Sequence, residues 1–392
     1  MIELLVDRKR RLALSFVHLH THTEYSLLDG SNKIKEYVAR VKELGMNSAA
    51  ITDHGVMFGV IDFYRAAKEA GINPIIGCEV YVAPGSRFDR EVGSGEDRYY
   101  HLVLLAENQK GYDNLMKIVS KGFVEGYYYK PRVDMDLLEK YHEGLIALSA
   151  CLAGAVARYL VRGLYEEAKR AALRYREIFG EGNYFLEMQD HGIAEQRLVN
   201  QQLMRMSKET GIGLVATNDI HYTYAEDEAS HDILLCIQTG KKLADEDRMR
   251  YVGGQYYVKS PEEMAELFSY APEALENTQK IADRCHVEFE FGVTKLPKFD
   301  VPEGYTSWEY LNKLCFEGLE RLYHPVTEEL RERLTYELDT IQTMGYVDYF
   351  LIVWDYINFA RRNDIPVGPG RGSGAGSLCA YCMGITQIDP IR

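Results

Sequence analysis

HLHTHTEYSLLDG, residues 18–30, decides the fold, because it places His20 and His22 two residues apart on an expected β-strand. Side chains at that spacing point to the same face of a strand, so the two imidazoles form a two-ligand clip. Asp219 and His221, in the run TNDIHY, repeat the spacing near the end of another expected strand. The two clips predict a metal site at the ends of strands.

Further candidate ligands lie at or near the ends of other expected strands. Imidazole, carboxylate and thiolate groups suit zinc, or less strictly manganese and iron. One tetrahedral ion cannot use them all, so the set predicts a site for several ions, and such sites commonly hydrolyse phosphate esters. Cys151 is the least specific candidate, since a lone cysteine is often a small buried apolar residue. The candidates are His20, His22, Asp29, His54, Glu79, His101, Cys151, Asp219 and His221.

Strand-like and helix-like segments alternate along residues 16–285. Several strands are continuous apolar runs, as in strands buried on both faces of a parallel sheet. The alternation predicts an α/β fold, a distorted (β/α)7 barrel with its chemistry at the C-terminal strand ends. His101 opens its strand, which a long β-hairpin over residues 80–105 would explain. The expected strands are 16–22, 48–53, 74–82, 100–106, 145–150, 184–188 and 213–218, and the expected helices are 34–44, 59–70, 112–121, 153–179 and 194–209.

The barrel pattern fades after Arg284, where two prolines and two glycines without helical period indicate a domain junction. Helical periodicity returns at 307–321, 327–344 and 346–363. The sequence therefore predicts an N-terminal extension (1–15), a metal-binding domain (16–285) and a mainly helical second domain (286–392).

GPGRGSGAGSL, residues 368–378, is the second chemical signal. Glycines let backbone amides approach a phosphate closely, and a helix N-terminus adds a favourable dipole. The run lacks the GK[ST] ending of a Walker loop and does not follow a strand as a dinucleotide fingerprint does. Phosphate binding and a flexible turn between two helices both remain open from these residues.

Composition limits the classes of protein to consider. The 392 residues carry a formal charge of −14. Any basic surface that binds nucleic acid must therefore be confined to a small part of the protein. The chain has no apolar run of membrane-spanning length and no signal-peptide pattern, and its seven cysteines lack regular spacing. We expect a cytoplasmic protein without a membrane partner.

HLHTHTEYSLLDG, ITDHG, GCEVY and ATNDIHY together resemble the motifs of the PHP (polymerase and histidinol phosphatase) domain. A PHP domain followed by GPGRGSGAGSL is similar to the family of bacterial replicative DNA polymerase III alpha subunits. The resemblance covers the chain from about Phe16 onward. It implies a PHP barrel and then the beginning of a polymerase palm domain, with the rest of the polymerase absent.

The resemblance also implies how the ligands divide among two or three zinc or manganese ions. His20, His22, Glu79 and Asp219 would hold the first ion, and Glu79 would bridge to a second held by His101 and Cys151. Asp29, His54 and His221 would hold the third. A complete set favours a metal-dependent 3′–5′ exonuclease that proofreads, and we expect Asp219, His221 and His54 to be its catalytic residues.

For the second domain the resemblance implies DNA-directed DNA polymerase chemistry. Arg371, Gly372, Ser373 and Ser377 would cradle the triphosphate of an incoming deoxynucleotide. The magnesium-binding aspartates of the family lie further along the chain, so we do not expect residues 1–392 alone to polymerise. The implied partners are a DNA primer–template, deoxynucleoside triphosphates, and a sliding clamp and other replisome subunits that bind through absent regions.

Two alternatives to the exonuclease stay open. One is a catalytically silent PHP scaffold that docks a separate proofreading subunit. The other is a histidinol-phosphatase-type phosphoesterase, which leaves GPGRGSGAGSL unexplained. Among lesser candidates, Glu187, Asp190 and His191 could line a substrate groove, His231 is expected on the surface, and the tyrosines at 127–129 could stack on bases or anchor a loop.

Overall fold

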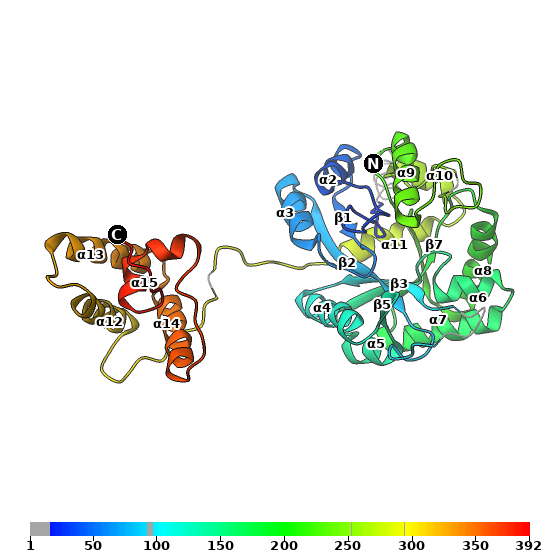
Figure 1. The fold of residues 1–392 in the computed structure, drawn as a ribbon. Coiled ribbons are helices and arrows are strands. Elements are labelled where there is room, and N and C mark those ends of the chain that lie inside the picture. The colour runs from blue at the N-terminus through cyan, green and yellow to red at the C-terminus, as the bar shows by residue number, and fades with distance from the viewer. Residues whose placement is uncertain (1–15, 92–96, 252, 294) are drawn as a thin grey trace, which may run out of the picture. The chain divides into compact units, whose positions relative to one another are not determined.

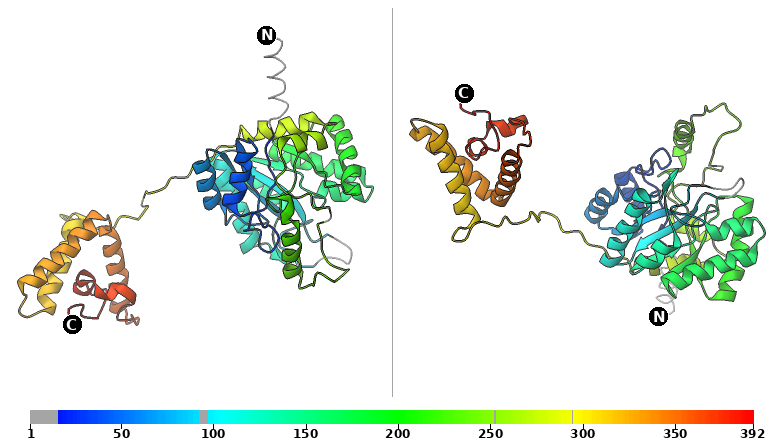
Figure 2. Two further views of the ribbon diagram at one scale, coloured as in Figure 1. Left: turned by 90° about the horizontal axis from the view of Figure 1, so that it is seen from above. Right: turned by 60° about the horizontal axis from the view of Figure 1, so that its bottom comes forward.

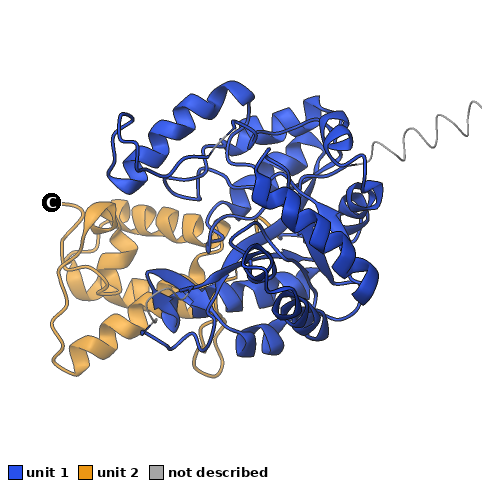
Figure 3. Ribbon diagram, turned by 90° about the vertical axis from the view of Figure 1, so that its right-hand side faces the viewer, with its two compact units in different colours: residues 1–289 blue, residues 290–392 orange. Residues whose placement is uncertain are grey.

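The computed structural model describes residues 16–91, 97–251, 253–293 and 295–392. The chain divides into two compact units, the first ending at Phe289 and the second spanning Glu290–Arg392 (Figure 3). The expected extension 1–15 lies outside the described residues. Each unit is described below by itself.

The first unit is built on one curled sheet with helices outside it (Figures 1 and 2). The strands run in the order β4-β5-β2-β3-β6-β7-β8, and β1 also pairs with β2. This confirms the expected α/β class. The strands are β1 (Ser48–Ile51), β2 (Asn73–Val82), β3 (Tyr100–Ala106), β4 (Tyr127–Tyr128), β5 (Lys130–Val133), β6 (Leu145–Leu148), β7 (Tyr184–Met188) and β8 (Gly213–Ala216).

The expected hairpin over residues 80–105 is present. β3 runs antiparallel to both β2 and β6, whereas β1 and β5 pair with β2 in parallel, as do β6 with β7 and β7 with β8. The register places Tyr81 opposite His101. Because Glu79 precedes Tyr81 by two positions, the side chains of Glu79, Tyr81 and His101 share one face of the sheet.

The expected first strand, 16–22, is wrong as a regular strand, although the segment is extended and buried. In the described structure this segment makes an isolated bridge rather than a ladder. On the side of β1, Ala50 N donates to His18 O at 3.2 Å. On the other side His22 N donates to Ile220 O at 2.8 Å. The segment thus lies between β1 and the chain after β8, and links the two edges of the curled sheet.

Helices cover the outside of this sheet. The helices at residues 34–43, 60–70, 109–124 and 194–210 agree with expectation, whereas those at 135–141, 228–239, 261–267 and 272–282 were not expected. The single helix expected over 153–179 is wrong: two helices replace it, separated at Gly163, whose φ of 76° ends the first in the left-handed conformation. The helices are α2 (Ile34–Glu43), α3 (Val60–Ala70), α4 (Gln109–Val124), α5 (Met135–Tyr141), α6 (Ala155–Val161), α7 (Tyr165–Phe179), α8 (Ala194–Thr210), α9 (Glu228–Thr239), α10 (Pro261–Leu267) and α11 (Pro272–Ala282).

The core of the first unit has two parts. The larger packs the apolar faces of the helices against the sheet. The smaller joins the other face of β3, through Val103 and Leu105, to β6, β8 and the end of α11. Val103 and Leu105 lie two and four residues after His101, so their side chains point to the same face of β3 as His101 does. The smaller apolar cluster therefore lies beside His101, further along the strand.

The second unit is helical, and its three long helices agree with the expected ranges to within one residue at each end. A buried cluster that includes Leu311, Leu334 and Leu351 holds them together. Among the described residues of the chain, no helix is both long and apolar enough to cross a membrane. The elements are α12 (Ser307–Leu322), α13 (Glu328–Thr343), α14 (Val347–Arg362), the 3-10 helix η2 (Gly372–Gly376) and α15 (Leu378–Cys382).

Close packing at the start of α4 gives a test of this fold. A Cβ at Gly111 would lie 1.8 Å from the carbonyl oxygen of Gly144, just before β6. We expect Gly111→Ala to lower the free energy of unfolding of the first unit by about 1–3 kcal/mol, because the backbone must move apart. Urea denaturation, with hydrogen-exchange protection of β3 and β6 as the readout, measures the change.

The matched control is Ser120→Ala, at an exposed position of the same helix. It should shift stability by no more than about 0.5 kcal/mol. Equal unfolding midpoints for Gly111→Ala and Ser120→Ala would contradict the close contact between α4 and the chain before β6.

Candidate metal centre

The predicted ligands come together at one end of the curled sheet, although they are spread along two hundred residues of chain. In the described part of the chain, ligand atoms within 4.8 Å of one another form three overlapping groups. Glu79 or His54 belongs to every group. The groups are His22, His54 and His221; His20, His22 and Glu79; and His54, Glu79 and His101.

Glu79 lies at the middle of the cluster and is almost fully buried. Its Oε1 atom is 2.9 Å from Nδ1 of His101 and 3.3 Å from Nε2 of His20. Its Oε2 atom is 2.6 Å from Nδ1 of His54 and 3.7 Å from Nε2 of His22. One carboxylate therefore faces four imidazoles, the arrangement needed for a bridging ligand.

Asp219 faces the first histidine clip. Its Oδ1 atom is 3.2 Å from Nε2 of both His20 and His22. The backbone of Asp219 has φ of 43°, in the left-handed region that residues other than glycine rarely adopt. Such strain persists where surrounding structure enforces it, most often at functional sites. Here it directs the carboxylate that follows β8 toward the other clip.

Asp29, His54 and His221 gather on another side of the cluster. Oδ2 of Asp29 is 3.1 Å from Nε2 of His54, and its Oδ1 is 3.8 Å from Nε2 of His221. Sequence reasoning missed Tyr251, whose hydroxyl lies 3.2 Å from Asp29 Oδ1 and 3.1 Å from His221 Nε2. No motif surrounds Tyr251, so only the folded chain reveals it.

Cys151, which follows β6, lies at the edge of the cluster. Its Sγ atom is 3.8 Å from Nδ1 of His101. Burial and the nearby carboxylates of Asp219 and Glu79 raise the pKa of its thiol well above the usual range. The thiol is therefore protonated at neutral pH unless a cation takes the place of its proton.

Hydrogen bonds fix the orientation of three of the imidazoles. Nδ1 of His20 is 2.6 Å from Oε1 of Glu187, and Nδ1 of His22 is 3.0 Å from the hydroxyl of Ser26. Nδ1 of His221 is 2.8 Å from the carbonyl oxygen of Asp219. With Nδ1–H as the donor in each case, all three Nε2 atoms turn toward the centre of the cluster, as metal-ligating histidines do.

Several buried polar atoms at the centre lack hydrogen bonds despite short approaches. Within the described residues, Oε2 of Glu79, Nδ1 of His54 and Oδ1 of Asp219 have no hydrogen-bond partner. Glu79 Oε2 and His54 Nδ1 are nevertheless only 2.6 Å apart, at an angle that makes no hydrogen bond. Atoms that converge without bonding one another fit a shared cation between them.

Burial and charge act in opposite directions on these groups. Burial disfavours the charged form of His54, but the carboxylates of Glu79 and Asp29 raise its pKa to about 10. Burial also disfavours ionised Glu79, whose pKa the imidazoles of His101 and His54 hold well below its usual range. Burial and neighbouring imidazoles lower the pKa of His22 to about 3. His22 is thus neutral and His54 is protonated before a cation binds.

The structure places two lesser candidates. Glu187 is buried and supports His20 from behind, and Thr217 and Gln189 also donate to it. His231 is not a surface residue, since it is buried with Nε2 2.8 Å from the carbonyl oxygen of Asp29. Leu235, four residues on and also buried, marks the inner face of α9 and was a usable signal for His231.

In the second unit, the glycine-rich run forms η2 and the start of α15. Arg371, Gly372 and Ser373 are exposed, whereas the hydroxyl of Ser377 donates to Oε2 of Glu337 at 2.9 Å. The backbone amide of Cys379 donates to the same oxygen at 3.0 Å. A carboxylate of the protein itself therefore occupies the start of α15, and Ser377 is engaged with it.

Comparison with known proteins places both units. The PHP domain family model matches residues 18–191, and the family model described as the bacterial DNA polymerase III alpha NTPase domain matches residues 309–392. The DNA polymerase III subunit alpha of Treponema pallidum is 49% identical over 97% of this chain and 32% of its own length. The subunits of Borreliella burgdorferi and Thermus aquaticus are 48% and 40% identical over 96% and 97% of this chain, and 33% and 36% of their own lengths.

The chain thus spans about one third of the length of the curated relatives it matches. The matches cover both the stretch that carries most of the clustered ligands and the stretch that carries the glycine-rich run. They confirm the resemblance drawn from the sequence motifs. The chain belongs to the family of bacterial DNA polymerase III alpha subunits and contains a PHP domain.

Proposed function

We propose that the first unit is a metal-dependent phosphoesterase that removes nucleotides from the 3′ end of DNA. The observation that carries this proposal is the convergence of buried imidazole and carboxylate groups on one place, where Glu79 Oε2, His54 Nδ1 and Asp219 Oδ1 make no hydrogen bond. Bound zinc or manganese ions would neutralise charge on a phosphate and acidify water. His20, His22, Asp29, His54, Glu79, His101, Cys151, Asp219 and His221 would hold two or three such ions.

The residues around the ligands support hydrolysis rather than a purely structural site. Glu187 and Ser26 hold His20 and His22 in one orientation, which keeps both Nε2 atoms available. The hydroxyl of Tyr251, beside Asp29 and His221, is a hydrogen-bond donor at the same place. A phosphate oxygen bound there would meet a donor as well as the cations.

For the second unit we propose a part in the DNA polymerase activity for which the relatives are named. The exposed backbone at Gly372 and Ser373, with Arg371 beside it, suits contact with the phosphates of a deoxynucleoside triphosphate. We propose a supporting role in this loop for Ser377, whose hydroxyl donates to Glu337. A primer–template, a sliding clamp and other replisome subunits are the partners of such a polymerase.

The first test pairs metal content with hydrolysis of a 3′-mismatched primer–template. We expect two to three metal ions per chain by elemental analysis, and metal-dependent trimming of the mismatch. Asp219→Asn keeps the shape of the side chain but removes the charge that faces both clip histidines. It should lower the trimming rate by more than about 100-fold, since loss of an outer partner alone typically costs 10–100-fold.

Asp364→Asn is the matched control, because Asp364 is another aspartate with positive φ, at 55°, in the second unit. Its trimming rate should equal that of the wild type. Bound metal without trimming in the wild type would contradict the nuclease and favour a scaffold that docks a proofreading subunit. Absence of bound metal would contradict the whole site.

Metal binding at neutral pH should release protons. The pKa of His54 is raised to about 10 and that of His20 is raised well above its usual range, so both rings carry a proton that a metal must displace. The apparent affinity should therefore increase as the pH rises from 6 to 8. Calorimetric titration in buffers of different ionisation enthalpy measures the release, about two protons per chain from these rings and a third where the thiol of Cys151 also binds.

His54→Asn removes one of these protons and should reduce the release by about one. His142→Asn, at a half-buried ring whose Nδ1 contacts only the carbonyl oxygen of Glu139, is the control. Identical apparent enthalpies in all buffers would show that no proton is displaced, and the prediction would be wrong.

The role of Cys151 can be tested separately with cobalt. If its sulfur binds a metal, the Co²⁺-loaded protein should show a sulfur-to-metal charge-transfer band in the near ultraviolet. Cys151→Ser should abolish this band, while Cys78→Ser, at a buried cysteine whose thiol donates to the carbonyl oxygen of Asp53, should keep it. A spectrum unchanged by Cys151→Ser would remove Cys151 from the ligand set.

A further inference from the structure

Aromatic side chains adjoin the metal centre on the side of His101. The ring of Tyr81 lies 5.2 Å from the ring of His101 and 6.2 Å from that of His54, measured between centroids. The ring of Tyr99 stacks on His101 at 6.1 Å, with the planes 12° apart. Tyr81 and Tyr99 contact each other at 4.9 Å. A row of aromatic rings, buried at Tyr81 and half-buried at Tyr99, therefore begins directly at the proposed ligands.

Two cations extend this surface. Nζ of Lys130 lies 5.3 Å from the centroid of the Tyr81 ring, and the guanidinium carbon of Arg98 lies 4.4 Å from the centroid of Tyr129. Within the part of the chain that the structure describes, neither cation has an ion-pair partner. We name Tyr81, Arg98, Tyr99, Tyr129 and Lys130 the aromatic–basic wall.

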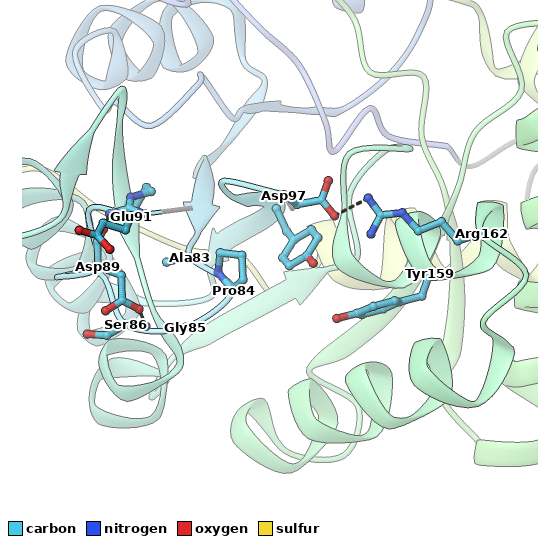
Figure 4. Close-up of a pocket in the computed structure, with 11 residues that line it drawn as sticks. Ala83, Pro84, Gly85, Ser86, Asp89, Glu91, Asp97, Tyr159 and Arg162 are labelled. Atoms are coloured by element: carbon cyan, nitrogen blue, oxygen red, sulfur yellow. Dashed lines mark hydrogen bonds and ion pairs between the residues drawn. The ribbon is translucent and has the colours of Figure 1, made fainter. Parts of the chain in front are cut away.

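The acidic residue next to the wall is already neutralised. Asp97 precedes Arg98, but its Oδ2 atom pairs with Arg162 at 2.7 Å (Figure 4). Its Oδ1 atom lies 3.8 Å from Arg158. The charges of Arg98 and Lys130 are thus left free in a chain whose formal charge is −14. Unpaired cations beside the proposed phosphoesterase centre suit contact with a phosphate backbone.

Tyr129 supplies an independent observation. It occupies the tip of a tight hairpin, where Tyr128 of β4 pairs with Lys130 of β5. Its φ of 62° is the left-handed conformation that such tight turns commonly use. The residue is 61% exposed, so the turn presents an aromatic side chain on which a ligand can stack.

We propose that the aromatic–basic wall binds a single-stranded nucleic acid and leads its end to the metal centre. Arg98 and Lys130 contact backbone phosphates, and a base stacks on Tyr129. A single strand fits better than a duplex, because the faces of paired bases are covered by their neighbours and cannot stack on a tyrosine. The proposal rests on the phosphoesterase function for its purpose, but binding can be measured without hydrolysis.

The test is fluorescence anisotropy of a labelled single-stranded oligothymidylate with the 392-residue chain in a metal chelator, which prevents hydrolysis. Tyr129→Ala should weaken binding by about 10-fold, the loss typical of one stacked base. Arg98→Gln and Lys130→Gln should each weaken it and reduce the slope of log affinity against log salt by about 0.7, the value for one phosphate contact on a single strand.

Arg205→Gln and Tyr165→Ala are matched controls. Arg205 lies 4.2 Å from the centroid of the Tyr165 ring, close to the 4.4 Å between Arg98 and Tyr129. Glu209, however, neutralises Arg205 at 2.7 Å. Neither control should change binding, and circular dichroism of every variant shows whether it is folded. Binding unchanged in folded wall variants overturns the proposal. If Arg98→Gln weakens binding and Tyr129→Ala leaves the affinity unchanged, a base does not stack on Tyr129.

Failure of the wall and failure of the phosphoesterase give different results. If the wall variants lose binding and the metal-loaded wild type trims nothing, the binding site is supported and the nuclease proposal is contradicted. If the wild type trims and the wall variants bind as before, the nuclease proposal is supported and the binding site is contradicted.

Discussion

The buried carboxylate of Glu79 is unfavourable by several kcal/mol unless opposite charge lies against it, and the rest of the first unit meets that condition. Nδ1 atoms of His54 and His101 lie 2.6 and 2.9 Å from its oxygens. The antiparallel register of β2 and β3 brings His101 to this place, and an isolated bridge joins His54 to Glu79. The sheet geometry and the charge distribution therefore depend on each other.

A second layer of contacts makes this arrangement specific. Glu187 behind His20 and Ser26 behind His22 each accept a hydrogen bond from the nitrogen that faces away from the centre. An imidazole fixed in this way loses no rotational freedom when a cation binds, and its ligand nitrogen is already directed correctly. The same contacts explain why the groups stay buried and close together although several carry like charge.

The parts of the fold that sequence predicted are those encoded by local signals. Apolar runs located β1, β2, β3, β6, β7 and β8, although not the short strands β4 and β5. The ligand spacings located the cluster of imidazoles and carboxylates. Each of these signals is complete within a few residues. Glu187 and Tyr251 were beyond such reasoning, since each reaches its partner across 167 or 222 residues of chain. The helix break at Gly163 and the irregular segment 16–22 were missed because tertiary contacts, rather than periodicity, determine them.

The segment that closes the curled sheet also carries His20 and His22. It is joined to its neighbours by isolated bridges and a few backbone hydrogen bonds rather than by a full ladder. Clip ligands on this segment face Glu79 of β2 and Asp219 after β8, so a cation bound among them would tie three separate parts of the chain together. Since a ligand that binds only the folded state stabilises it by mass action, metal binding here would be coupled to closure of the sheet. A family member that lost these ligands would need extra packing along this segment to keep the same fold.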